Sequence, residues 1–185
     1  KNVSVNITKP DNTTENLTMM HIVNDYYYCI FNDTIQPGVY NYSIYVTDHA
    51  NNTDWVPEIG EFTIDFDDPQ IKTVSASPHT VGFGYNVTIS ANVTDSVSGV
   101  DTVSVNITYP NETQGNYTMS YTSGDTYQYV FTDTWLVGQY NYTIWATDNS
   151  SNINSSSGHH FHVSAQATMS IATLKNSYSG TQYIN

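Results

Sequence analysis

The sequence predicts an all-β chain built from tandem antiparallel β-sandwiches. Apolar and polar residues alternate with a period of two in short segments, and Gly, Pro, Asn and Asp separate these segments. No segment shows the 3.6-residue periodicity of a helix. In residues 3–8, for example, Val3, Val5 and Ile7 would face one side of a strand and polar residues the other. A hydrophobic content of 38%, with sixteen tyrosines among 185 residues, is sufficient for small β-sandwich cores.

The chain repeats itself with a period of 100 residues. Residues 3–8 recur as residues 103–108, and the register holds without a gap through Asp48 and Asp148. A period of this size corresponds to a whole domain and not to a solenoid unit.

The second copy predicts seven strands, at residues 71–80, 85–94, 103–109, 116–121, 127–132, 140–147 and 159–164. Seven strands in about 95 residues is the size of an immunoglobulin-like or fibronectin-type sandwich. Tyr140, and Tyr40 in the first copy, are expected to fix the corner before a strand by bonding back to the backbone.

The repeat also predicts the domain organisation. Residues 1–66 form an immunoglobulin-like domain that lacks its first two strands, and residues 67–164 form a complete one. Residues 165–185 supply the first strands of a further domain or a donor strand, because Ser170–Asn185 resembles Ser75 to about Ser90. Two arrangements remain open: a window on a longer tandem array, or a tail that completes the head of the next molecule.

Signals for asparagine glycosylation are in large excess over chance. Fifteen of the twenty asparagines open an Asn-x-Ser/Thr triplet, whereas pairing with the 44 serines and threonines predicts about five by chance. We expect N-linked glycans on most of them, which places the chain outside the cell. The alternative is that Thr- and Asn-rich strands form such triplets by accident. The residues are Asn2, Asn6, Asn12, Asn16, Asn32, Asn41, Asn51, Asn86, Asn92, Asn106, Asn111, Asn116, Asn141, Asn149 and Asn154.

The charge balance excludes several classes of partner. The net charge is −13, with four lysines and no arginine, so neither nucleic acid nor an anionic membrane surface is expected to bind. Cys29 is the only cysteine and is expected to pack in the core, the lesser alternative being an intermolecular bond. A glycosylated exterior protein without intrachain disulfides is typical of an archaeal or bacterial envelope. The sequence shows no signal peptide and no segment expected to insert into a membrane.

The acidic residues predict one metal site. In an immunoglobulin-like topology the B–C loop, the F–G loop and the incoming linker lie at the same end of the domain, where carboxylate oxygens suit Ca²⁺. The alternative is that each Asp only caps its own turn. The linker carries Asp65, Asp67 and Asp68, and Asp33 of the first copy would face the junction from the other side. The predicted ligands are Asp67, Asp68, Asp95, Asp101 and Asp148.

Several segments resemble a known family. Residues 73–78, 86–95, 98–100 and 142–148 are similar to the tandem immunoglobulin-like domains of archaeal and bacterial cell-surface proteins, and the resemblance covers nearly the whole chain. It implies stalks, adhesins, sheath or filament components, or appendages of enzymes. The Gly-Asn that usually follows the Thr-Asp turn in this family is replaced by residues 50–52 and 150–152.

These observations favour a structural extracellular glycoprotein of a cell-surface stalk, filament or envelope layer such as an S-layer. Its partners would be copies of itself or neighbouring domains, arranged head to tail. We expect no enzyme, since no nucleophile motif, phosphate loop or zinc-spaced cluster is present. One alternative is a carbohydrate-binding or adhesion module that binds cell-surface glycans through the outward Trp145 and Tyr45, although these rings would more simply pack on the protein's own glycans. Another is an accessory domain of a secreted hydrolase.

Overall fold

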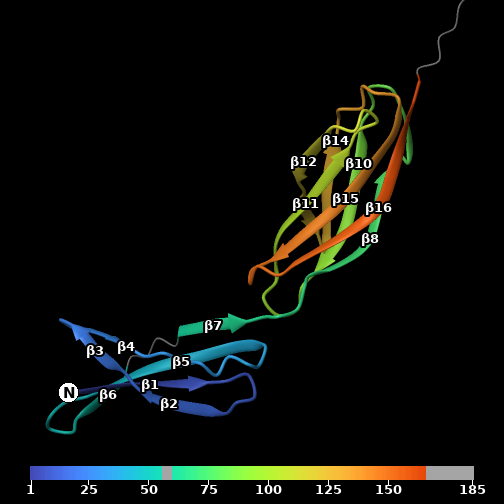
Figure 1. Cartoon of the computed structure of the whole chain (residues 1–185). Coiled ribbons are helices and arrows are strands. Elements are labelled where there is room, and N and C mark those ends of the chain that lie inside the picture. The colour runs from blue at the N-terminus through green and yellow to red at the C-terminus, as the bar shows by residue number, and fades with distance from the viewer. Residues whose placement is uncertain (56–59, 166–185) are drawn as a thin grey trace, which may run out of the picture.

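The computed structural model describes residues 1–55 and 60–165 of the chain. Within these residues it contains strands and no helix, which confirms the predicted all-β class (Figure 1). The first unit, residues 1–64, contains β1 (Asn2–Thr8), β2 (Thr14–Thr18), β3 (Met20–Val23), β4 (Tyr26–Tyr28), β5 (Gly38–Thr47), β6 (Thr53–Trp55) and β7 (Gly60–Ile64). The second unit, residues 70–164, contains β8 (Gln70–Ser77), β9 (Thr80–Gly82), β10 (Val87–Thr94), β11 (Val100–Thr108), β12 (Gln114–Thr118), β13 (Ser120–Ser123), β14 (Thr126–Phe131), β15 (Gly138–Asp148) and β16 (Ile153–Ser164).

The second unit is a sandwich of two sheets. One sheet has the order β13-β14-β10-β8, and the other has the order β12-β11-β15-β16-β9. The alternating pattern of β10 buries Val87, Ile89, Ala91 and Val93 between them. The facing strands contribute Val105, Ile144, Phe161 and their neighbours to the same core. Because every second residue of these strands is apolar, each sheet presents one apolar face to the other.

Three predicted strands differ from the observed ones. The strand predicted at residues 71–80 ends before Pro78, because proline has no N–H for the ladder, and β9 then pairs with β16 in the opposite sheet. The strand predicted at 116–121 divides at the buried Met119, where the chain passes from one sheet to the other. Strand β16 begins at Ile153, six residues before the predicted start.

The first unit repeats the pairing of the second unit at an offset of 100. Strand β1 pairs β2 with Ser4 opposite Thr18, and β11 pairs β12 with Ser104 opposite Thr118. The sheet β2-β1-β5 continues into β6 and β7, which both pair β5. Opposite it lies a sheet of only β3 and β4, so the described residues of this unit contain no counterpart of β8, β9 or β10.

A tyrosine corner fixes the entry to β5 and to β15, as expected. The hydroxyl of Tyr140 donates to the carbonyl of Leu136 at 3.1 Å, and that of Tyr40 donates to the carbonyl of Gln36 at 3.1 Å. Both rings are completely buried. Each corner therefore ties its loop to the core.

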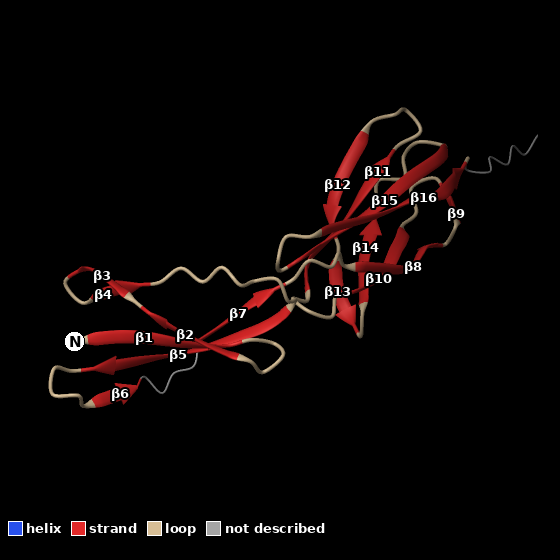
Figure 2. Ribbon diagram, turned by 60° about the horizontal axis from the view of Figure 1, so that its bottom comes forward, coloured by secondary structure: helices blue, strands red, loops and turns tan. Residues whose placement is uncertain are grey.

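The two units follow one another end to end (Figures 1 and 2). Strand β7 leads through residues 65–69 into β8, and among the described strands none of one unit pairs with one of the other. The predicted donor segment, residues 165–185, lies outside the described residues except for Ala165.

Candidate functional site

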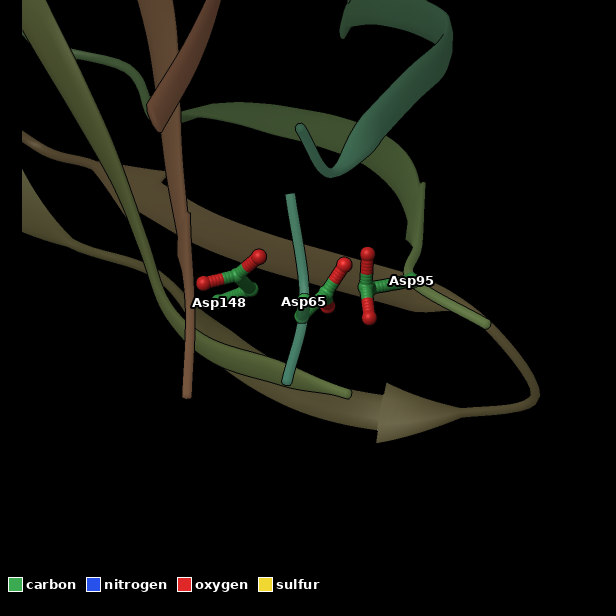
Figure 3. A group of neighbouring side chains, drawn as sticks. All are labelled: Asp65, Asp95 and Asp148. Atoms are coloured by element: carbon green, nitrogen blue, oxygen red, sulfur yellow. The ribbon is translucent and has the colours of Figure 1, made fainter. Parts of the chain in front are cut away.

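Three carboxylates meet where the linker enters the second unit. Asp65 follows β7, Asp95 follows β10, and Asp148 ends β15. One oxygen of each carboxylate lies within 4.8 Å of the other two. Figure 3 shows Asp65 between Asp95 and Asp148. Residues distant in the sequence thus form a single acidic group at the junction of the units.

Asp95 and Asp148 are held in place by their own loops. Asp95 Oδ1 accepts the backbone N–H groups of Val97, Ser98 and Gly99 at 2.7–3.1 Å. Such a turn, in which an Asp side chain binds the backbone that follows it, is a common use of this residue. The turn after β10 therefore fixes the position of this carboxylate.

Asp148 organises the loop between β15 and β16 in the same way. Its Oδ1 accepts the backbone N–H groups of Ser150 and Asn152, each at 2.8 Å, and its Oδ2 accepts the side-chain amide of Asn152 at 2.7 Å. Asp148 is 2% exposed.

Asp65 is the linker's contribution and is 7% exposed. Its Oδ1 accepts the N–H of Asp67 at 3.0 Å, and its Oδ2 accepts the N–H of Ser98 at 3.0 Å. Burial raises the pKa of this carboxyl, but hydrogen bonds from Ser98 and Asp67 outweigh it, and the net pKa is lowered. Asp65 is therefore held as the charged carboxylate.

Two amide side chains attach the linker to the second unit. The side-chain amide of Asn152 donates to the carbonyl of Asp65 at 3.3 Å, and that of Asn154 donates to the carbonyl of Pro69 at 2.9 Å. The linker is thus bound at both of its ends to the loop between β15 and β16 and to the start of β16.

No lysine of residues 1–55 and 60–165 forms an ion pair with the acidic group. The ion pairs among the described residues are Lys1–Asp25, Lys9–Glu15 and Lys9–Asp33, and none reaches the junction. Buried charges are normally paired or coordinate a metal. Three hard oxygen donors in one place fit Ca²⁺.

The structure brings together only part of the predicted ligand set. Asp95 and Asp148 lie in the acidic group, but Asp67, Asp68 and Asp101 are exposed and lie outside it. Asp101 accepts the hydroxyl of Thr102, on its own strand. Asp33 pairs with Lys9 and is not part of the acidic group.

None of the fifteen asparagines in glycosylation triplets is buried. Asn6, Asn92, Asn106 and Asn154 are half-buried, and the others are exposed. The apolar middle residue is buried in several triplets on strands, as in Val87, Val93 and Ile107. The predicted outward orientation of these asparagines is therefore present in the fold.

An aromatic groove lies on the same outer face. Trp145 is 45% exposed and lies opposite Ser104 on β11. With Gln114, Thr143 and two glycosylation triplets, Asn106 and Asn116, it lines a groove of about 450 Å³. The tryptophan predicted to point outward does so, next to two predicted glycan positions.

Comparisons with known proteins give similarity only at the level of solved structures. No family model matches the chain, and no curated protein sequence matches it. A tetra-tandem repeat from the extending region of a large adhesion protein is 17% identical, with a TM-score of 0.47, over 87% of this chain and 42% of that one. A Ca²⁺-stabilized, ice-binding adhesin of an Antarctic bacterium is 15% identical, with a TM-score of 0.36, over 90% of this chain and 40% of that one.

A third structure, of a 1.5-MDa bacterial ice-binding adhesin, is 14% identical with a TM-score of 0.38 and covers 90% of this chain and 55% of that one. The chain thus spans about half or less of the length of these structures. Among the described residues there is no helix with the length and apolar character needed to cross a membrane.

Proposed function

We propose that this chain is a structural section of an extracellular stalk, filament or envelope layer, without enzymatic activity. The proposal rests on the three carboxylates that meet where the linker enters the second unit. Asp65 of the linker inserts between two loops of the second unit and joins two carboxylates that no lysine of the described residues balances. A cation at this point would hold successive units in one orientation.

In this role Ca²⁺ is bound by Asp65, Asp95 and Asp148. The ion supplies positive charge to three buried or half-buried carboxylates, and the carboxylates supply oxygen ligands to the ion. Asp148 and Asp95 are already oriented by their loops, so the linker is the part that the ion fixes. The junction would then be stiff when Ca²⁺ is present and looser without it.

The outer faces are proposed to carry N-linked glycans, which would make the surface soluble and resistant at the cell exterior. This is supported by the excess of glycosylation triplets and by the absence of any buried asparagine among the fifteen.

A second candidate function is supported by the groove at Trp145. An exposed tryptophan in a groove of about 450 Å³ is suited to stack on a sugar ring. Because Asn106 and Asn116 line the same groove, a glycan on either would occupy it. We therefore propose that Trp145 packs against the protein's own glycan, and a carbohydrate-binding module remains the alternative if both asparagines are bare.

Small-angle X-ray scattering of the chain in Ca²⁺ tests the structural role. A compact domain of this length would have a radius of gyration of about 16 Å. We expect a radius of gyration well above this value and a distance distribution that shows two separate units. A chelator should broaden that distribution. A radius near that of a compact domain would contradict the proposal.

A further inference from the structure

Strand β16 carries three of the chain's six histidines, and two of them lie on a free edge. Among the described strands, β9 pairs with β16 only at residues 162–164, so the part of β16 before them pairs with β15 alone. This part contains His159 and His160. Its free edge faces β8, which is the edge strand of the opposite sheet (Figures 1 and 2). The two histidines therefore lie at the seam between the sheets of the second unit.

A β-bulge directly precedes these histidines. The register between β15 and β16 shifts by one residue between Tyr142 and Ile144 of β15. Gly158 of β16 lies in this bulge with a φ of +87°, in the left-handed region that favours glycine. A bulge bends its strand and changes the direction of the side chains beside it. Here those side chains are His159 and His160.

A hollow of about 320 Å³ lies between β8 and β16 at the bulge. Residues 74–76 of β8 line one side of it, and residues 158–160 of β16 line another. His79, in the turn between β8 and β9, also lines this hollow. Three imidazoles from distant parts of the sequence thus border one small space, which residue spacing alone does not reveal.

The rings of His79 and His160 are in contact with each other. Their centroids are 5.1 Å apart, and the angle between their planes is 63°. The carbonyl of His79 accepts the N–H of His162 at 2.9 Å, and His160 lies opposite Asn141 in the ladder with β15. Both residues are exposed, so an ion can reach the pair from solvent. The backbone therefore holds two imidazoles side by side at the surface.

His159 has a different role in this hollow. Its Nε2 shares a hydrogen bond of 2.8 Å with the hydroxyl of Ser156, and its ring stacks on Tyr142 with 5.4 Å between centroids. Burial, and to a lesser extent the neighbouring His160, lower the pKa of His159. His159 is therefore a neutral ring that forms a wall of the hollow, and the two exposed rings are the available metal ligands.

We propose that His79 and His160 bind a divalent transition-metal cation of the class that includes Zn²⁺, Cu²⁺ and Ni²⁺. Imidazole nitrogen suits these ions, whereas Ca²⁺ takes oxygen ligands. Two protein ligands leave the other coordination positions to water, which the exposed site admits. The site shares no residue with the acidic group at the junction.

The ion would join the two sheets of the second unit. His79 lies in the turn that passes from β8 in one sheet to β9 in the other, and His160 lies on β16. An ion that binds only the folded state would therefore stabilise the closed seam. The net charge of −13 attracts cations to the whole surface, so binding must be compared between single histidines and carboxylates.

Calorimetric titration of the full-length chain with Zn²⁺ tests the two ligands. We expect His79→Asn and His160→Asn each to weaken Zn²⁺ binding by roughly tenfold or more, because either change leaves one imidazole. His162→Asn is the matched control, since His162 is exposed on the same face of β16 but does not line the hollow, and its affinity should be retained. Unchanged affinity in either of the first two variants, or an equal loss in His162→Asn, would overturn the proposal.

Asp148→Asn separates this site from the junction, because carboxylates also bind zinc. This variant should keep the zinc affinity of the unmodified chain while it loses the Ca²⁺ response expected of the acidic group. Zinc binding that is lost in Asp148→Asn would assign the ion to the junction and overturn the histidine site. The two proposals can therefore fail independently.

NMR of the unmodified chain gives a readout that needs no substitution. Stoichiometric Zn²⁺ should shift the imidazole nitrogen resonances of His79 and His160, and Ca²⁺ should leave them unchanged. His21 and His49 of the first unit are internal references. Zinc shifts that appear first at these references, or that are absent at His79 and His160, would overturn the proposal.

Discussion

Single residues decide which glycosylation triplets are accessible. The carrier atom is the side-chain nitrogen, and in Asn149 this atom donates to the carbonyls of Ser98 and Gly99 at 2.8 and 3.2 Å. In Asn154 it donates to the carbonyl of Pro69. Both bonds belong to the turn and linker that surround the junction. Asn116, by contrast, is exposed on the strand β12.

We therefore expect uneven glycan occupancy. Glycopeptide mapping of native protein should find Asn116 and Asn86 occupied and Asn149 and Asn154 largely bare, because the side-chain nitrogens of the latter two are engaged at the junction. Full occupancy of both junction asparagines would show that these bonds do not limit glycosylation. Bare asparagines throughout would remove the glycoprotein part of the proposal.

The pKa of Asp11 tests whether hydrogen bonds to a carboxylate form in solution, and the second unit has an equivalent residue that cannot titrate. Hydrogen bonds from the Thr13 hydroxyl and backbone lower the pKa of Asp11 to about 2. At the equivalent position Asn111 makes the same two bonds to Thr113 and cannot titrate. The carboxylate in the folded state therefore prefers its charged form, and its contribution to stability is present above the ordinary pKa of 3.8 and is lost as pH falls toward about 2.

An NMR titration of the Asp11 carboxyl carbon should give a midpoint near 2, whereas Asp11→Asn should lose the pH dependence of this turn between about 4 and 2. A midpoint at the ordinary value of 3.8 would show that the Thr13 bonds do not form in solution.

The residue that the sequence could not select is Asp65. The sequence predicts that a linker carboxylate lies beside the second unit. It does not show which one, because Asp65, Asp67 and Asp68 stand within four residues. In the structure Asp65 is the linker carboxylate that joins the group, and its two oxygens accept the backbone N–H groups of Asp67 and Ser98. The bond from Ser98 depends on how the linker docks on the second unit, and residue spacing does not predict that docking.

At the scale of elements, glycines determine where β5 and β15 can begin. Gly138 has a φ of +136°, and a Cβ at this position would lie 3.0 Å from the Cβ of Pro110. Gly38 has the same relation to Pro10. Each glycine therefore lets the chain approach the preceding hairpin closely, two residues before the tyrosine of the corner.

Gly138→Ala should lower the free energy of unfolding of the second unit by about 2 kcal/mol or more, because it adds backbone strain and a close contact. Gly124→Ala is the matched control, since Gly124 has a φ of +58° and nothing within 4 Å of an added Cβ. We expect about 1 kcal/mol there. Urea unfolding measures both, and equal losses would contradict a special role for the corner.

Element boundaries were predictable where alternation and turn residues agree. The repeat of 100 residues predicted equivalent pairing in both units, and the registers of β1–β2 and β11–β12 agree residue for residue. The passage of the chain between sheets at Met119 and at Pro78 was missed. In each case alternation continues through the crossing, so periodicity alone gives one long strand where the fold makes two.

At the scale of the whole molecule, two sandwich units in line depend on one short linker. Five residues, 65–69, separate β7 from β8, and their bonds to Ser98, Asn152 and Asn154 hold them against the second unit. Without a counter-ion the three carboxylates repel one another. The linker would then be the first part of the junction to loosen.

Thermal unfolding in millimolar Ca²⁺ and in chelator tests this account most directly. An ion that binds only the folded state at 100 times its dissociation constant adds about 2.7 kcal/mol, which would raise the midpoint by several degrees. Asp148→Asn should abolish the rise. Asp48→Asn should retain it, because the Asp48 loop has the same hydrogen bonds but no partner carboxylates among the described residues. The account predicts a Ca²⁺-dependent midpoint that is lost only in Asp148→Asn, and an identical midpoint with Ca²⁺ and with chelator in the unmodified chain would contradict it.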